Sequence, residues 1–339
     1  MDLAGTSAHK PDPGIIFDTL NAYQRSAALK AAIELNLFTE IARGNRSADA
    51  IAKAVSASAR GVRILCDYLV ISGFLVKDVG EYSLTLDSAA FLDRNSPGYF
   101  GSVAAFLLDP RLIAPFLNLT DVIRAGTTTL PGEGTVSHDN PIWVDFAKQM
   151  APMIFSAAAE IADLVAGDGK IRVLDIAAGQ GLFGIMIAQH NPMAQITALD
   201  WPNVLSVATE NAKKFGVANR HSLLPGDAFE AEFGGPYDLV LVTNFFHHFD
   251  PPTCEKLMLK IRAALTPTGR CLTLDFVPND DRVSPPMAAG FAMMMLGTTA
   301  AGDAYTFSDY ETMFRNAGYR SSNLHLLNMA PQPVIVSRA

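Results

Sequence analysis

The chain has 339 residues, of which 49% are apolar and 18% charged, so an intrinsically disordered protein is excluded and two folded domains are expected. The net charge of −8 disfavours nucleic-acid binding, which depends on clustered Lys and Arg, and no apolar run reaches the roughly 20 residues that cross a bilayer. The three cysteines are too far apart for a disulfide framework or a paired-thiol metal site, and residues 1–14 lack the pattern of a secretory signal, so we expect a cytoplasmic protein without nucleic-acid, membrane or metal partners.

The first hundred residues predict a small, mainly helical domain. Apolar residues recur every three or four positions across 15–41, which is typical of helix and here indicates two helices. Ser47 can cap a short third helix, and 62–73 predicts another that ends at a glycine. Two strand-like segments, 74–77 and 82–85, are separated by turn residues and complete a winged-helix order.

This winged-helix order would suit DNA binding, but balanced charge leaves no basic stripe for a recognition helix. We therefore interpret 1–98 as a dimerisation domain, which holds two chains together through residues 15–95. From 99 to 141 the sequence is rich in Pro, Gly and Thr, which is typical of a connection between domains. We assign 99–160 to a helical connector and 161–339 to the second domain.

Residues 161–339 predict an α/β domain, because strand-like and helical segments alternate along them. Such alternation is typical of a parallel sheet with helical crossovers, as in a Rossmann-like fold. A turn is expected at 267–269, before the last parallel strand. The expected strands are at 172–176, 195–199, 222–224, 239–242 and 271–276, with a final pair near 322–327 and 333–337, and the expected helices start at 182 and cover 204–215, 254–265 and 308–317.

The first strand of this domain leads into a glycine-rich turn and a helix start, within residues 173–184. Gly179 and Gly181 lack a Cβ where a ligand has to touch the main chain, and the helix N-terminus presents free N–H groups to an anion such as a carboxylate. The spacing also satisfies Gly-x-Gly-x-x-Gly. A nicotinamide dehydrogenase is therefore an alternative, with Asp200 as its ribose-binding acid.

Three features favour S-adenosylmethionine over a dinucleotide. Asp175 lies late in the strand, where a dinucleotide site continues apolar, and two residues separate the strand end from the first glycine. Downstream, the segment Gly-Asp-Ala-Phe at 226–229 follows the expected strand at 222–224. Its carboxylate can accept from the amino group of an adenine, and its ring can stack on the adenine face. Asp175, Asp200 and Asp227 would form one row at the carboxyl ends of the strands, where open parallel sheets bind ligands.

These segments resemble the class I O-methyltransferases of the caffeate and acetylserotonin type, in which a winged-helix dimerisation domain precedes the S-adenosylmethionine-binding domain. The resemblance covers nearly the whole chain and rests on segments 35–38, 62–74, 173–184, 200–204, 226–229 and 247–254. It implies that Asp200 holds the ribose hydroxyls and Asp227 the adenine amino group, while Phe249 replaces a tryptophan near the adenine. The residues expected to bind the methyl donor are Asp175, Gly179, Gly181, Asp200, Trp201, Gly226, Asp227, Ala228, Phe229, Asn244 and Phe249.

Methyl transfer to oxygen requires removal of the acceptor's proton, a task suited to an imidazole that titrates near neutrality. The strand at 239–242 leads to two histidines. The family's His-Asp-Trp-x-Asp-x-x-Cys pattern, aligned on Cys254, selects His247 as the base and puts His248 at the Asp position. We expect His248 to be an ordinary helix-start residue, and the resemblance assigns Asp275 to orient His247.

The second acid of the family is absent from its usual position. In the family it lies in a Gly-x-Glu-Arg-Thr segment, which reads Gly-Asp-Ala-Tyr-Thr at 302–306, with Ala304 at the glutamate position. Asp303 could replace this catalytic glutamate from one residue earlier, or the site could work with a single carboxylate.

The acceptor pocket is expected to combine the connector with the segment that follows the last parallel strand. Methionine thioethers suit the edges of flat aromatic rings, although the methionines at 293–295 also fit an ordinary helix core. The residues assigned to the acceptor are Phe146, Met150, Met153, Met294, Met295 and Thr299.

We therefore predict an enzyme that transfers a methyl group from S-adenosyl-L-methionine to a hydroxyl of a small aromatic or polyketide-like metabolite, as a homodimer and without a metal. Three alternatives stay open: a C- or N-methyltransferase of the same fold, an NAD-dependent oxidoreductase, and a ligand-sensing regulator whose winged helix binds DNA. The balanced charge of the first domain and the presence of His247 count against the regulator.

Overall fold

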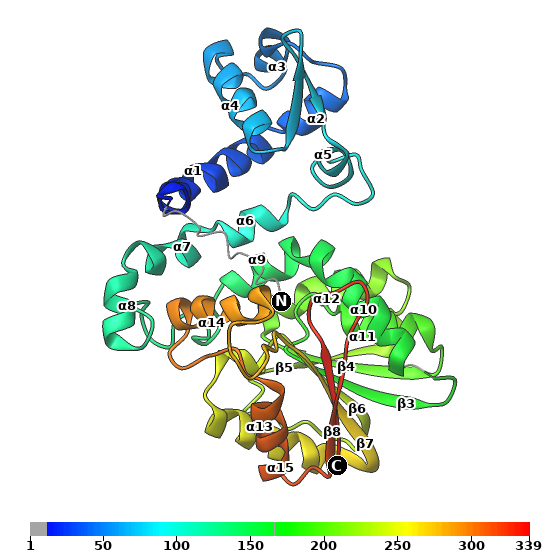
Figure 1. The fold of residues 1–339 in the computed structure, drawn as a ribbon. Coiled ribbons are helices and arrows are strands. Elements are labelled where there is room, and N and C mark those ends of the chain that lie inside the picture. The colour runs from blue at the N-terminus through cyan, green and yellow to red at the C-terminus, as the bar shows by residue number, and fades with distance from the viewer. Residues whose placement is uncertain (1–11, 166) are drawn as a thin grey trace, which may run out of the picture. The chain divides into compact units, whose positions relative to one another are not determined.

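The computed structural model describes residues 12–165 and 167–339, which form two compact units that divide between Leu108 and Asp109 (Figure 1). Residues 1–11 lie outside this description, and they make up most of the segment 1–14 that lacks the pattern of a secretory signal. The division falls within 99–160, the segment assigned to a connector. The short helix at 103–107 groups with the first unit, and the helices from 110 onward group with the second.

The first unit contains the expected helices and a two-stranded antiparallel hairpin. Ser47, Ser58 and Thr85 each accept a backbone N–H at the N-cap of a helix. Because Ser58 is a cap, the fourth helix begins at Ala59, three residues before the predicted start at 62. The elements are α1 (Gly14–Glu34), α2 (Leu37–Ala42), α3 (Ala48–Ala54), α4 (Ala59–Ile71), β1 (Leu75–Asp78), β2 (Glu81–Leu84), α5 (Leu86–Phe91) and α6 (Val103–Leu107).

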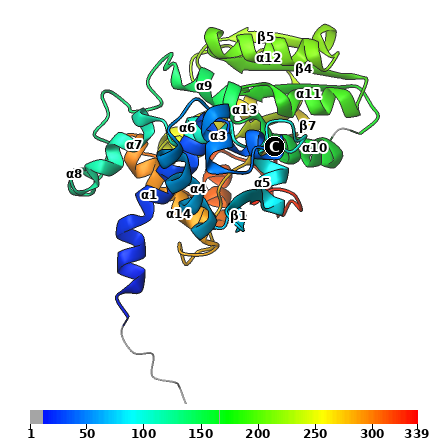
Figure 2. The ribbon, with the colours of Figure 1, turned by 90° about the horizontal axis from the view of Figure 1, so that it is seen from above.

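Helix α1 exposes large apolar side chains along its first turns. Ile15, Phe17, Leu20 and Tyr23 are 76%, 60%, 66% and 69% exposed. Figure 2 shows these turns projecting beyond the other helices of the first unit. An exposed apolar surface of this kind is typical of an interface with another chain.

The second unit is an α/β domain on a seven-stranded sheet, which confirms the predicted fold class. Its helices and strands alternate as the sequence indicated. The elements are α7 (Pro110–Leu117), α8 (Leu119–Ala125), α9 (Ile142–Gln149), α10 (Ala151–Val165), β3 (Ile171–Ile176), α11 (Leu182–His190), β4 (Ala194–Asp200), α12 (Pro202–Lys214), η1 (Ala218–Arg220), β5 (His221–Pro225), β6 (Tyr237–Thr243), η2 (Phe246–His248), α13 (Pro251–Ala264), β7 (Leu265–Leu274), α14 (Pro286–Thr298), α15 (Phe307–Asn316), β8 (Ser321–His325) and β9 (Val334–Arg338).

The sheet has the strand order β5-β4-β3-β6-β7-β9-β8. Strands β3 to β7 are parallel, whereas β9 pairs antiparallel with both β7 and β8. Helices α10, α11 and α12 cover one face and α13 and α15 the other (Figure 1). The strand order reverses beside β3, so the turns after β3, β4 and β6 border the crevice where doubly wound sheets bind ligands.

One segment of the chain differs from the prediction, and the connector contains several short helices. The turn expected at 267–269 is an irregularity inside β7, which pairs Leu265 with Tyr237 and then Arg270 with Leu239. The connection from 99 to 141 contains helices α6, α7 and α8, and some of its prolines and glycines stand at the ends of these helices. Pro110 begins α7, and Gly126 with φ +68° ends α8.

Across the described ranges, no single helix has both the length and the apolar character needed to cross a bilayer. The helical segments Val103–Leu117 and Leu119–Ala125 are long and apolar enough only when they are counted as one, and the chain bends between them.

Candidate functional site

The glycine-rich turn between β3 and α11 contains three residues in the left-handed region. Ala177, Gly179 and Gly181 have φ values of +52°, +57° and +74°, a conformation that glycine adopts without strain. A Cβ on Gly181 would lie 3.0 Å from the Cβ of Ala208 on α12, whereas a Cβ on Gly179 would meet nothing within 4 Å. Gly181 therefore permits the turn to pack on α12, and Gly179 borders open space where a ligand can approach the main chain.

Asp175, near the end of β3, is fully buried. Its Oδ2 accepts the N–H of Gly184 at 3.1 Å, and its Oδ1 has no hydrogen-bond partner among the described residues. Burial raises the pKa of this carboxyl to about 7, although the N–H of Gly184 acts in the opposite direction. A buried acceptor without a partner is costly, so this oxygen is suited to receive a donor group of a ligand.

Asp200, at the end of β4, connects the turns that follow three neighbouring strands. Its Oδ2 accepts the N–H of Gly179 at 2.8 Å, and its Oδ1 accepts the N–H of Trp201 at 2.7 Å. Its carbonyl accepts the N–H of Gly226, after β5, at 3.0 Å. Burial raises the pKa of Asp200 to about 6. The indole of Trp201 lies 4.2 Å from the ring of His138.

The turn after β5 places a carboxylate beside an aromatic cluster. Asp227 Oδ1 accepts the N–H of Phe229 at 2.6 Å. The ring centroid of Phe229 is 6.3 Å from that of Phe245 and 4.9 Å from that of Phe249, and the last two are 5.0 Å apart. Lys260 on α13 donates to the carbonyl of Phe229 at 2.8 Å and so fixes this turn on the helix.

Two other residues expected to bind the methyl donor, Asn244 and Ala228, are held by hydrogen bonds within the chain. Asn244, at φ +53° after β6, accepts a hydrogen bond from Gln332 Nε2 at 2.5 Å and donates its N–H to the carbonyl of Leu274 at 2.8 Å. Ala228 is buried, and its carbonyl accepts from Lys260 at 3.1 Å.

The structure brings His247 and Asp275 together, as the sequence predicts. His247 is on η2 and is 3% exposed, and its Nδ1 lies 2.5 Å from Oδ1 of the fully buried Asp275, which follows β7. A carboxylate only accepts, so Nδ1 carries a proton, and the neutral form of this imidazole has its lone pair on Nε2. Asp275 also accepts the N–H of Phe276 at 2.8 Å and the hydroxyl of Tyr310 at 2.7 Å.

Aromatic rings surround this pair. Phe291 on α14 meets the imidazole of His247 edge-on at 4.8 Å, and it stacks on Phe276 at 3.9 Å with an interplanar angle of 18°. Trp143 on α9 meets the ring of His248 at 5.2 Å. Helices α9 and α14 therefore both bring aromatic side chains to η2.

His248 is buried, and its Nδ1 has no hydrogen-bond partner within the described part of the chain. Burial, and then the neighbouring His247, lowers the pKa of its imidazole well below its usual range. The two rings are 4.2 Å apart. His248 is therefore neutral near pH 7 and contributes no charge to the site.

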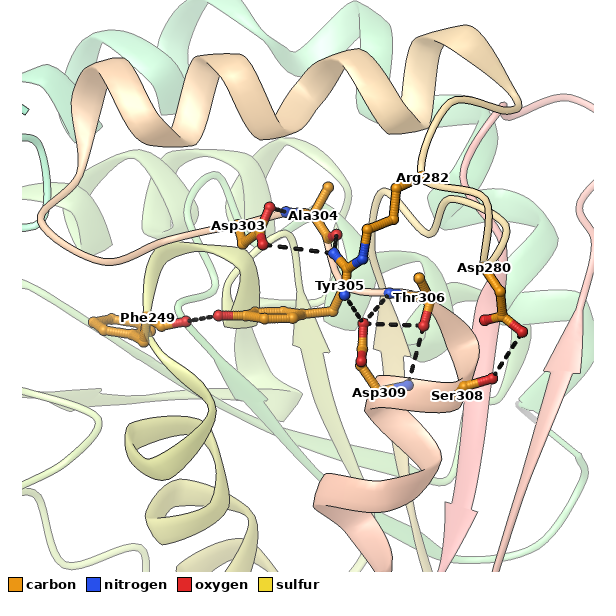
Figure 3. A network of polar contacts seen from close by, with 9 residues as sticks. All are labelled: Phe249, Asp280, Arg282, Asp303, Ala304, Tyr305, Thr306, Ser308 and Asp309. Carbon is orange, nitrogen blue, oxygen red and sulfur yellow. Dashed lines mark hydrogen bonds and ion pairs between the residues drawn. The ribbon is translucent and has the colours of Figure 1, made fainter. Parts of the chain in front are cut away.

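The structure does not bring the carboxylate of Asp303 to the imidazole of His247. Its Oδ1 accepts the N–H of Ala304 at 2.8 Å, and its Oδ2 lies 3.6 Å from Arg282, whose other nitrogen donates to Asp309 at 2.7 Å (Figure 3). The backbone N–H of Asp303 instead donates to the carbonyl of His247 at 2.9 Å. Asp303 thus contacts His247 through its main chain.

The segment after α14 lies directly on η2. A Cβ on Gly302 would stand 2.3 Å from the carbonyl oxygen of His247 and 2.6 Å from Oγ1 of Thr299, so only glycine fits there. The hydroxyl of Tyr305 donates to the carbonyl of Phe249 at 2.6 Å (Figure 3). This segment therefore fixes the backbone on both sides of His248.

The residues assigned to the acceptor lie on α9, α10 and α14 or directly after them, and they differ in burial. Met295 and Thr299 are 3% and 1% exposed, and Thr299 Oγ1 donates to the carbonyl of Met295 at 2.8 Å, so both belong to the packed end of α14. Met150 ends α9 and is 5% exposed. Phe146 on α9, Met153 on α10 and Met294 on α14 are half-buried.

Sequence reasoning missed Phe291, Phe276 and Tyr310, which contact the pair of His247 and Asp275. A signal for Phe291 exists, because it lies three and four residues before Met294 and Met295 and so shares their side of the helix. No local pattern marks Tyr310 as a partner of Asp275.

Two family models match the chain. A model of the O-methyltransferase domain matches residues 136–320, and a model of the O-methyltransferase dimerisation domain matches residues 17–94. The chain therefore belongs to the S-adenosylmethionine-dependent O-methyltransferase family. This membership favours the methyl donor over a nicotinamide dinucleotide at the glycine-rich turn.

Similar proteins cover nearly the whole chain. The 3-hydroxy-5-methyl-1-naphthoate 3-O-methyltransferase of Streptomyces sahachiroi is 27% identical over 93% of this chain and 92% of its own length. The tetracenomycin polyketide synthesis 8-O-methyltransferase of Streptomyces glaucescens is 27% identical over 92% of each chain. A crystal structure from Nostoc punctiforme, assigned as an O-methyltransferase, is 51% identical, covers 97% of this chain and 100% of its own, and has a TM-score of 0.95.

Proposed function

We propose that S-adenosylmethionine binds in the crevice beside β3, through the turns that follow β3, β4, β5 and β6. The unpaired Oδ1 of Asp175 and the open space at Gly179 support this site, because they offer an acceptor and a main-chain approach. Asp200 and the rings of Phe229 and Phe249 offer a carboxylate and an aromatic surface for a nucleoside. The donor supplies an electrophilic methyl group, and these residues bind and orient it.

We propose that His247 takes the proton from the acceptor's hydroxyl at Nε2. The observation that carries this proposal is the 2.5 Å contact between His247 Nδ1 and Asp275 in a buried setting. The contact fixes the tautomer whose free lone pair is on Nε2, and it stabilises the imidazolium that proton transfer produces. Asp303 contributes through its backbone N–H, which holds the carbonyl of His247.

The acceptor is proposed to be a flat, hydroxylated aromatic or polyketide-like molecule. Aromatic rings prefer to stack or to meet edge to face, and Phe291, Phe276 and Trp143 provide such surfaces around the two histidines. The half-buried Phe146 and Met294 add adaptable apolar contacts from α9 and α14. Naphthoate and polyketide compounds in the names of the similar enzymes agree with this class.

We propose that the enzyme works as a cytoplasmic homodimer. The dimerisation-domain match at 17–94 and the exposed apolar residues of α1 support the dimer. The three cysteines are buried and unpaired, which is typical of a reducing compartment.

The proposed function is tested with a panel of hydroxylated naphthoates and anthraquinones, by following the release of S-adenosylhomocysteine. With an accepted compound, we expect His247→Ala to lower turnover by at least about 10²-fold, because a general base typically contributes 10²–10⁴-fold. Calorimetric affinity for S-adenosylhomocysteine should stay within about threefold of the unmodified enzyme.

His325→Ala is the matched control, because His325 lies on the exposed edge strand β8 and its loss should leave turnover unchanged. A His247→Ala enzyme with near-normal turnover would move the assignment to methyl transfer onto carbon or nitrogen. A panel without any substrate would contradict the proposed acceptor class.

A further inference from the structure

We propose that Tyr310 is a positioning residue for the reaction: its buried hydroxyl holds the second oxygen of Asp275 and weakens this carboxylate as a hydrogen-bond acceptor for His247, which stays a neutral base. This inference rests on the proposed role of His247. The position of the family's second acid is occupied by the buried Ala304, so Tyr310 acts on a base that is oriented by a single carboxylate.

The geometry places Tyr310 on the oxygen of Asp275 that His247 does not contact. Tyr310 is on α15 and is fully buried, and its hydroxyl donates to Oδ2 of Asp275 at 2.7 Å. The other oxygen, Oδ1, accepts from His247 Nδ1 at 2.5 Å and from the N–H of Phe276 at 2.8 Å. Three donors therefore fix both the plane and the distance of this carboxylate.

Tyr310 acts only as a donor near neutral pH. Burial, and then the charge of Asp275, raises the pKa of its phenol well above the usual range, so the hydroxyl keeps its proton. A hydrogen bond to a carboxylate stabilises the charged form and makes it a weaker base. Without the hydroxyl, the carboxylate of Asp275 would attract a positive charge on His247 more strongly. The doubly protonated imidazolium of His247 would then be favoured over the neutral base.

The surroundings of the pair leave Asp275 as the main source of charge on His247. Burial lowers the pKa of His248 and raises that of the Cys254 thiol and the Tyr305 phenol, so all three are uncharged near pH 7. The carboxylate of Asp303 is paired with Arg282. The titratable groups that act on the pair are His248 on η2, whose ring is 4.2 Å from that of His247, and Cys254 on α13 and Tyr310 on α15, which both interact with Asp275. The side chains of Asp303 and Tyr305, on the segment after α14, bind Arg282 and the carbonyl of Phe249 instead.

The test uses the full chain saturated with S-adenosylhomocysteine, so no acceptor is required. The nuclear magnetic resonance signal of the His247 Nδ1 proton is identified as the one lost in His247→Ala. Its position is then followed against pH in Tyr310→Phe and in the matched control Tyr319→Phe. Tyr319 is 5% exposed and donates to the carbonyl of Met258 at 3.2 Å, so the control removes another buried hydroxyl, one that is bonded to a backbone carbonyl and not to Asp275.

We expect the signal in Tyr310→Phe to move downfield and its pH transition to rise by about 0.5–1 pH unit, whereas Tyr319→Phe leaves both unchanged. With an accepted naphthol as substrate, the pH at which kcat/KM falls on the acidic side of its profile should rise by the same amount. If Tyr310→Phe does not fold, 3-fluorotyrosine is placed at position 310. Its side chain keeps the shape of tyrosine, and its hydroxyl donates more strongly to Asp275. The pH of the His247 transition should then fall.

An unchanged transition in Tyr310→Phe, or in the fluorotyrosine protein, overturns the inference. A change of equal size in Tyr319→Phe overturns it as well, since a general loss of core packing would then explain both. The role of His247 is decided separately by the turnover of His247→Ala, so failure of one proposal does not imply failure of the other.

Discussion

Asp175 is a carboxyl whose burial opposes stability in the absence of a ligand. Its pKa rises from 3.8 to about 7 on folding, so between these two values the folded chain binds more protons than the unfolded chain. The free energy of unfolding therefore decreases as the pH rises from about 4 to about 7, and this loss is complete above pH 7.

We expect Asp175→Asn to raise the unfolding temperature of the ligand-free protein above pH 7 and to flatten its decline between pH 4 and 7. The amide keeps the shape of the carboxyl without its charge. Affinity for S-adenosylhomocysteine should fall in the same variant, because the acceptor oxygen is lost. Scanning calorimetry at pH 5 and pH 8 measures the first effect, and titration calorimetry measures the second.

The control is Asp163→Asn, whose side chain is 72% exposed and which should leave both measurements unchanged. Equal unfolding temperatures for Asp175→Asn and the unmodified protein at pH 8 would show that the buried carboxyl carries no such cost.

Single residues also show where sequence reasoning reaches its limit. The pairing of His247 with Asp275 was predicted through the family resemblance, and the sheet forms it because each residue follows one of two neighbouring parallel strands, whose carboxyl ends meet. Tyr310 could not, because it lies 35 residues after Asp275 on a helix whose core side carries several aromatic residues. The direction of the Asp303 side chain depends on Arg282, a partner that no local pattern identifies.

At the scale of elements, the segment between α14 and α15 is the support of η2. Gly302→Ala would place a Cβ 2.3 Å from the carbonyl oxygen of His247, and the segment would have to move away. Such overpacking typically costs about 1–3 kcal/mol, so we expect a fall of several degrees in the unfolding temperature and a loss of turnover. Scanning calorimetry and the S-adenosylhomocysteine release assay measure the two effects.

Gly290→Ala provides the comparison, because a Cβ at this position within α14 would meet nothing within 4 Å. Alanine is the better helix former, so this variant should be at least as stable as the unmodified protein. Equal behaviour of the two alanine variants would mean that the segment after α14 does not support η2 in the way described.

The elements themselves follow closely from the sequence, because apolar periodicity and capping residues are local signals. The helix at Ala59 began earlier than predicted because Ser58 provides the cap, and this signal was present in the sequence. The bulge at 267–269 was predicted as a turn, because Pro and Gly disfavour a strand locally while pairing of β7 with β6 on both sides of the bulge decides the outcome. Tertiary pairing therefore overrode local preference at that point.

At the scale of the whole molecule, the exposed side of α1 predicts association of two chains. We expect the double change Phe17→Asp and Leu20→Asp to shift the protein from dimer to monomer, because a charged group cannot be buried without a partner. Sedimentation velocity at micromolar concentration measures the change. In Asp18→Asn, a polar change on the same helix, the dimer should persist, and an unmodified protein that sediments as a monomer would contradict the prediction.

The position of β9 in the sheet has a consequence for synthesis on the ribosome. Strand β9 lies between β7 and β8 and pairs with both, although it is the last strand of the sequence. While the chain is being translated, β7 emerges first and has an unpaired edge until Val334–Arg338 leaves the exit tunnel. Asp275 directly follows β7, so a nascent chain truncated before β9 would expose this edge beside an incomplete active site and would be a natural target for chaperones.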